Sequence, residues 1–94
     1  MKLDKSTKRI AKRVKKGFQG YPEITLAYFG ETTSHATEVT VKFVLEEGAE
    51  AQEERFASQC DIREDEVIQT TLLKIIERAN AKTVTEIEGV SIIQ

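Results

Sequence analysis

The chain has 94 residues, of which 39% are hydrophobic and 32% are charged, and its formal net charge at pH 7 is −2. This length and composition predict a single globular domain over residues 1–94, with one modest core, and they exclude a disordered chain. They also exclude a membrane-spanning helix, because no apolar run approaches the roughly 18–20 residues that a span needs.

The positive charges are concentrated at the start of the chain. Residues 1–20 carry eight Lys or Arg against one Asp, a net charge of +7, whereas residues 21–94 carry six basic and fifteen acidic side chains, a net charge of −9. Such a division indicates an acidic partner or a chain that neutralises itself. A single cysteine excludes an internal disulfide, and the absence of an apolar signal-peptide core leads us to expect a cytoplasmic protein.

The first predicted element is a helix over residues 3–16. Apolar side chains recur at helical spacing, basic side chains fill the other positions, and Gly17 follows where helices commonly end in a left-handed residue. We expect Leu3, Ile10 and Val14 to face the interior, with the basic side chains in water. The segment 20–22, Gly-Tyr-Pro, predicts an extended exit, because a residue before proline avoids helical angles.

Two strands are predicted next, at residues 23–30 and 37–46, joined by a polar hairpin loop at 31–36. Both segments alternate between apolar and polar side chains, which is the pattern of a sheet with one buried face. The residues expected in the core are Ile24, Leu26 and Tyr28 in the first strand and Val39, Val41, Phe43 and Leu45 in the second. The other sheet face would carry an apolar set, Ala27, Phe29 and Val44.

The remainder of the chain predicts helices and a third strand. A weak helical pattern indicates a short helix at about 50–58, and a strong apolar stripe predicts a helix over 66–79, with Asp61 and Asp65 as candidate N-caps. Residues 83–88 predict a strand, and residues 90–94 either continue it past Gly89 or pair elsewhere. The expected fold is α+β in the order α-β-β-(α)-α-β, a three-stranded sheet in which a helical crossover joins the hairpin to the third strand, with helices on one face.

The basic helix is the first candidate site. Clustered Lys and Arg bind phosphates, and single-strand binders add aromatic platforms, which Phe18 and Tyr21 would supply just beyond the helix. The same charges also fit a solvated helix face, a contact with an acidic protein, or a lipid surface. The residues that would contact a partner or a phosphate are Lys8, Arg9, Lys12, Arg13, Lys15 and Lys16.

Other chemistry-bearing residues predict no active site. The acidic residues within 46–54 lack the spaced aspartates of a metal-binding loop, so we expect a solvated face or a contact with the basic helix, within the chain or between subunits. His35 lies in a polar loop without an oriented partner, and Cys60 has acidic neighbours, which favours a semi-buried structural cysteine. We therefore expect no catalytic residue, no metal site and no cofactor.

Two stretches resemble a family of small bacterial proteins of unknown function. They are GYPEITLAYFG at residues 20–30 and VLEEGAE at residues 44–50, which follow a basic helix as they do in that family. The resemblance covers about residues 8–88 and implies a recurring turn at 20–22 and a recurring start of a helix at 47–50. It suggests the edge of a pocket at Tyr21, Glu47 and Glu50. Members of the family continue into a tail rich in Cys, His and Pro that could bind metal, and because this sequence lacks such a tail we expect none of that chemistry.

These features together predict a binding or interaction module and not an enzyme. We expect it to act through a protein partner or as a homo-oligomer, because an exposed apolar set such as Ala27, Phe29 and Val44 is a liability unless it is covered. Nucleic-acid binding through the basic helix is the alternative, and a small enzyme with a site between subunits ranks third. No membrane partner is expected.

Overall fold

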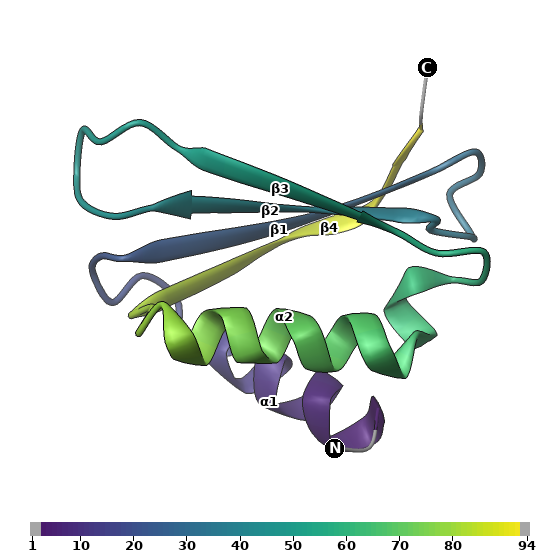
Figure 1. Ribbon diagram of the computed structural model, residues 1–94, viewed down its shortest axis with the longest axis horizontal. Coiled ribbons are helices and arrows are strands. Elements are labelled where there is room, and N and C mark those ends of the chain that lie inside the picture. Colours follow the sequence, from purple (N-terminus) through teal and green to yellow (C-terminus); the bar gives the residue numbers. More distant parts are fainter. Residues whose placement is uncertain (1–2, 93–94) are drawn as a thin grey trace.

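The computed structural model describes residues 3–92, apart from the side chains of Leu3 and Glu88. The chain forms two layers, with both α-helices on one face of a single sheet (Figure 1). The helices are α1, Leu3–Lys15, and α2, Glu66–Arg78, and a short 3-10 helix, η1, Ile62–Glu64, precedes α2. The strands are β1, Glu23–Gly30; β2, Glu38–Val44; β3, Gln52–Ala57; and β4, Thr83–Ile92. The prediction of an α+β fold with helices on one face is confirmed.

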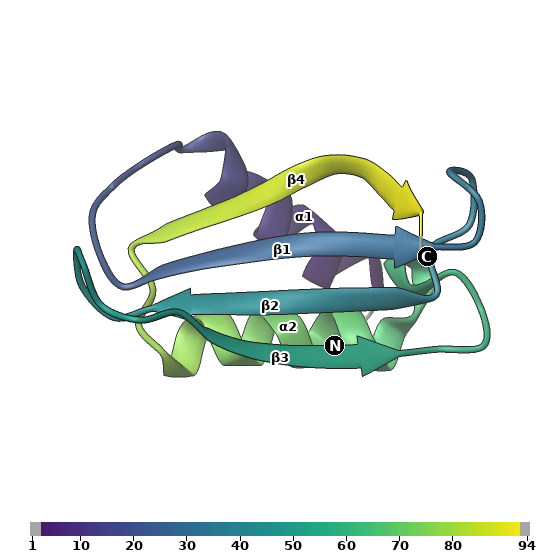
Figure 2. The ribbon, with the colours of Figure 1, turned by 90° about the horizontal axis from the view of Figure 1, so that it is seen from above.

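The sheet has the strand order β3-β2-β1-β4 (Figure 2). β1 and β2 form the predicted antiparallel hairpin, in which Leu26 lies opposite Val41, and β3 adds antiparallel to β2. After α2, β4 returns parallel to β1, as the predicted helical crossover requires. Over residues 3–92 the sheet therefore has four strands, and the prediction of three strands was wrong.

The additional strand is β3, which occupies the segment predicted to be a short helix at about 50–58. Phe56 lies opposite Val39 and is half-buried, whereas Glu53, Glu54 and Arg55 are exposed. Because β3 is an edge strand, most of its side chains stay in water and the alternation that marks a strand is faint. Glutamate favours helix on propensity alone, and pairing with β2 overrides that preference.

The turn before β3 corrects a second expectation. Gly48 has a φ of +83°, and the turn that contains it joins β2 to β3. Residues 47–50 therefore lead into a strand and not into a helix. Leu45, which was expected in the core, is 60% exposed because β2 ends at Val44.

The core lies between the sheet and the two helices. α1 contributes Ile10, which is 2% exposed, and Val14, which is half-buried against the core cluster. The hydroxyl of Ser6, which is fully buried, lies 3.0 Å from the hydroxyl of Thr70 on α2. The main buried apolar side chains of the other elements are Ile24, Leu26, Tyr28, Val39, Val41, Leu72, Leu73, Ile76 and Val84. The expected inward direction of Ile10 and Val14 is confirmed, and the side chain of Leu3 lies outside the described residues.

The predicted N-caps are confirmed, and the helices predicted over 3–16 and 66–79 each end one residue earlier, at Lys15 and Arg78. Asp61 caps η1 by accepting a hydrogen bond from the backbone N–H of Arg63, and Asp65 caps α2 by accepting one from the N–H of Ile68. Gly17 follows α1 with a φ of +72°, and Asn80 follows α2 with a φ of +53°. These local signals therefore set where the helices begin and end.

β4 continues through Gly89 and ends at Ile92. Between the pairs Leu26–Glu86 and Tyr28–Val90, β1 advances by two residues and β4 by four, so β4 contains a bulge. Gly89 has a φ of +78° there, and Val90 returns to the core. The interrupted alternation thus marks a bulge within one strand, and the expectations for residues 93 and 94 lie outside the described residues.

Candidate functional site

The outward face of α1 and the loop before β4 form one basic surface. We define it by the residues Arg9, Lys12, Arg13, Lys15, Lys16 and Lys82. All of these side chains except Arg13, which is half-buried, are exposed. Five of the six predicted contact residues are thus brought together, whereas Lys8 pairs instead with Asp4 at 3.2 Å within α1. Lys82 was missed, because nothing in the sequence marks a single lysine between α2 and β4.

Two hollows run through the basic surface. The first has a volume of about 320 Å³, lies between α1 and α2, and is lined by four of the cations together with Leu73 and Glu77. The second, of about 300 Å³, is lined by Arg13 and Lys16 together with Gln19, Ala81 and Lys82. Because Arg13 and Lys16 line both hollows, the two are neighbouring parts of one basic groove.

The groove is held in shape by bonds between distant parts of the chain. The guanidinium of Arg13 donates from Nη1 to the carbonyl of Ala81 at 3.2 Å, which ties α1 to the loop before β4. The backbone N–H of Gln19 donates to Oγ1 of Thr83 at 2.8 Å, and the same hydroxyl donates to the carbonyl of Gly20 at 2.6 Å. Thr83 is buried, so the segment 17–22 is fixed against the start of β4.

An aromatic ring stands beside the groove. Phe18 is 63% exposed, and its ring meets that of Tyr21 edge-on, with centroids 5.5 Å apart and planes at 76°. Because most of its surface is exposed, the Phe18 ring is available for contact with a further ring. The exposed ring follows Lys16 by two positions, in the segment that Thr83 fixes.

The cations of the basic surface have no carboxylate partner among the side chains that the structure describes, which do not include that of Glu88. The ion pairs in this part of the chain are Lys8–Asp4 and Arg63–Asp61, and neither includes a residue of the basic surface. Glu77 lines the groove without forming an ion pair. The acid-rich strand β3 forms the sheet edge farthest from β4, whereas α1 packs on α2 and β4 (Figure 2). The positive groups are therefore open to a ligand.

The other predicted site residues lie elsewhere. Tyr21 is near the same end of the sheet as the turn at 47–50, because Glu23 lies opposite Val44, but the main hollows of the described structure are lined by other residues. His35 is exposed in the hairpin loop. Cys60 was predicted to be semi-buried and is exposed, because it lies in the turn between β3 and η1, where its sulfur is 3.2 Å from the hydroxyl of Ser58.

The apolar set Ala27, Phe29 and Val44 lies on the uncovered face of the sheet, and each member is half-buried. A hollow of about 200 Å³ on this face is lined by Thr25, Ala27, Phe29, Thr40, Lys42, Glu53, Arg55 and Ile87. Polar and charged side chains thus surround the apolar ones. Self-association through this face stays a prediction.

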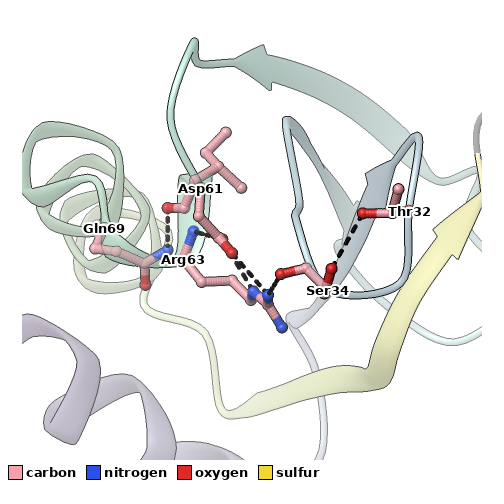
Figure 3. Close-up of polar contacts among 6 residues, drawn as sticks. Thr32, Ser34, Asp61, Arg63 and Gln69 are labelled. Atoms are coloured by element: carbon pink, nitrogen blue, oxygen red, sulfur yellow. Dashed lines mark hydrogen bonds and ion pairs between the residues drawn. The ribbon is translucent and has the colours of Figure 1, made fainter.

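A separate polar network lies at the opposite end of the sheet (Figure 3). Arg63 donates to both carboxylate oxygens of Asp61, at 3.0 and 2.7 Å, and to the carbonyl of Ser34 at 3.2 Å. The hydrogen bonds from Arg63 hold the pKa of Asp61 at about 2, below its ordinary value of 3.8. Gln69 donates to the carbonyl of Ile62 and to the hydroxyl of Tyr28, whose pKa is raised by burial. The polar groups of this network form hydrogen bonds with one another, so the network holds the hairpin loop against η1.

No protein-family model, curated protein or solved structure matches the chain. Within residues 3–92, no helix is long and apolar enough to cross a membrane. No three His, Cys, Asp or Glu side chains lie close enough together in this range to hold a metal ion. The resemblance to the small bacterial family stays an expectation, and the basic surface, which combines charge, shape and an exposed ring, is the candidate site.

Proposed function

We propose that the protein is a binding module that holds single-stranded nucleic acid along its basic surface. The observation that carries the proposal is the groove between α1 and α2, which three cations of α1 and Lys16, just past its end, line without a carboxylate partner among the described side chains. A phosphate backbone neutralises such a row of cations and releases its own counterions, which provides most of the affinity of sequence-independent binding.

The arrangement of the cations favours a ligand over a merely solvated face. Arg9 and Arg13 are four residues apart on α1, where like charges destabilise a helix by about 0.2–0.5 kcal/mol per pair, and Lys16 follows Lys12 at the same spacing just past the end of α1. A helix whose polar face only contacts solvent avoids this cost when acidic and basic side chains alternate on that face. Lys82 adds a further positive charge from a distant part of the chain. A bound polyanion would relieve the repulsion among all of these groups.

Phe18 favours a single strand over a duplex. Bases of a single strand can unstack and lie on an aromatic ring, which contributes about 1–3 kcal/mol per base. The bases of a duplex are already stacked on one another, so an exposed ring offers them nothing comparable. Phe18 lies in the fixed segment 17–22, between Lys16 and Gln19, which both line the second hollow, and this placement suits a strand whose phosphates follow the groove and whose base reaches Phe18.

The experiment measures fluorescence anisotropy of labelled oligothymidine and oligouridine of about 20 nucleotides, titrated with protein at several salt concentrations. If five of the six cations each neutralise one phosphate, log Kd should change against log salt with a slope of about 3.5, because single strands contribute about 0.7 per phosphate. Affinity should then fall about a hundredfold between about 50 and 200 mM salt.

A matched pair of variants separates the basic surface from net charge. Lys12→Glu with Lys16→Glu should abolish binding, whereas Lys42→Glu with Arg55→Glu, which changes the net charge equally at exposed positions on the uncovered face of the sheet, should largely preserve it. Equal losses in both variants, or no salt-sensitive binding at about 50 mM salt, would refute the proposal. Binding to polyglutamate but not to oligonucleotides would instead identify an acidic protein as the ligand.

A further inference from the structure

The opposite edge of the sheet offers a second surface. β3 is an edge strand that pairs with β2 on one side, and no strand of the described residues lies on its other side. The outward N–H and C=O groups of such a strand can accept an added strand. This edge is remote from the basic surface, so the inference below goes beyond the nucleic-acid proposal.

An apolar hollow of about 240 Å³ lies beneath this edge. Val41 and Phe43 of β2, Ile75 of α2 and the C-cap residue Ala79 line it, and the lining is completed by Gln52, Glu53 and Glu54 of β3. In Figure 1 the first half of β3 lies farther from the C-terminal half of α2 than the end of β3 lies from the start of α2, as the twist of the sheet requires. Phe43, Ile75 and Ala79 are only half-buried, so apolar surface is left uncovered where the edge strand is also free.

The surroundings of this edge are acidic. Glu46, Glu47 and Glu50 lie in the turn before β3, and all three are exposed together with Glu53 and Glu54 on the strand. On the face away from the helices, Lys42 of β2 lies opposite Glu53, which shows the kind of neighbour that Glu53 accepts from a paired strand. An added strand with a basic side chain beside Glu53 would repeat this arrangement on the other side of β3.

The charges also disfavour a second copy of β3 as the added strand. A two-fold antiparallel pairing centred on Glu53, Glu54 or Arg55 would set that residue against its own copy, and like charges directly opposite are destabilising. The edge therefore discriminates by repulsion as well as by attraction. Its acidic character selects a segment that carries positive charge.

We propose that the edge of β3 and the hollow beside α2 bind an extended, basic peptide segment of a partner protein, which adds to the sheet as a fifth strand. Its backbone pairs with the outward groups of β3. Its apolar side chains, at alternate positions, enter the hollow against Phe43, Ile75 and Ala79. The intervening Lys or Arg side chains lie on the other face, beside Glu53 and close to the acidic turn.

The test uses a peptide of about seven residues, enough to span β3, in which lysine alternates with valine. The protein is uniformly labelled with 15N, and the peptide is added up to about 1 mM. We expect shifts in the amide signals of residues 52–57 and of the C-terminal half of α2, and slower hydrogen exchange of β3 amides. A peptide that alternates glutamate with valine should cause no shift, and a lysine peptide N-methylated on the strand-facing amides should bind at least about tenfold more weakly.

Two sets of variants locate the site. Glu53→Lys with Glu54→Lys should weaken the lysine peptide by about tenfold or more, whereas Glu31→Lys with Glu64→Lys, an equal change of charge at exposed positions elsewhere, should change its affinity by less than about twofold. Ala79→Leu should fill the hollow and weaken the peptide without altering any charge. Hydrogen-exchange protection across the core shows that each variant is folded.

Several outcomes would overturn the inference. They are the absence of any shift, shifts confined to other elements, equal binding of the N-methylated peptide, and no effect of Ala79→Leu. Equal binding of the N-methylated peptide would identify unspecific attraction between charges. Because Glu53→Lys with Glu54→Lys leaves the basic surface intact, its binding of oligonucleotides tests the nucleic-acid proposal separately.

Discussion

Replacing Ile10 by alanine tests how α1 is held in place. Ile10 is 2% exposed, and α1 contacts α2 and β4 but does not belong to the sheet. Truncating a fully buried isoleucine to alanine costs about 2–5 kcal/mol, so we expect a loss of about 3 kcal/mol in the free energy of unfolding. A domain of this length has about 5–14 kcal/mol of stability, so the variant should still fold.

The assay is urea unfolding followed by circular dichroism, with a thermal scan beside it. A loss of about 3 kcal/mol should lower Tm by about 12–24 °C in a domain of this size. Ile10→Val is the matched control and should cost only about 1 kcal/mol, because it keeps most of the buried surface. A cost below about 1 kcal/mol for Ile10→Ala would refute the packing of α1 described above. Oligonucleotide affinity, measured well below the Tm, should be unchanged because no cation of the basic surface is altered.

Three further changes give separate predictions. Phe18→Ala should weaken oligothymidine binding by about 5- to 150-fold in the anisotropy assay, the equivalent of about 1–3 kcal/mol, while unfolding in urea is unchanged because the ring is exposed. Asp61→Asn keeps the cap but removes the negative charge that Arg63 binds. Because the pKa of Asp61 in the folded protein, about 2, lies below its ordinary value of 3.8, the wild type should be more stable than the variant by about 1 kcal/mol at pH 7. Urea titrations at a series of pH values should show this difference in stability disappearing between about pH 4 and about pH 2. Gly30→Ala would drive its Cβ into the carbonyl oxygen of His35, so urea unfolding should show a loss of about 2 kcal/mol or more, and an unchanged midpoint would contradict this crowding.

Periodicity predicted the elements that bury a continuous apolar row. β1, β2 and α2 each place such a row in the core, so their spacing alone identified them. β3 escaped detection because an edge strand above a partly open hollow buries little, and Phe56 was then read as part of a helical pattern. What decides its structure is pairing with β2, a long-range contact that no local window contains.

Only the part of the candidate site that lies on helix α1 could be predicted from the sequence. Cations at helical spacing on α1 must share a face, so their clustering follows from the sequence. The other walls of the groove could not be predicted from the sequence. Glu77 and Lys82 line it only because α1 packs on α2 and because Arg13 forms a hydrogen bond with the carbonyl of Ala81. The apolar hollow beside β3 was equally hidden, since it exists only because a strand replaced the expected helix.

The bulge in β4 has a consequence for how the sheet can grow. Around Gly89 the spacing of backbone groups along β4 is irregular, so its outer margin cannot present a regular ladder to an incoming strand. Only the other margin, at β3, remains regular enough to be extended. Copies of the protein are thereby hindered from joining margin to margin into an endless ribbon.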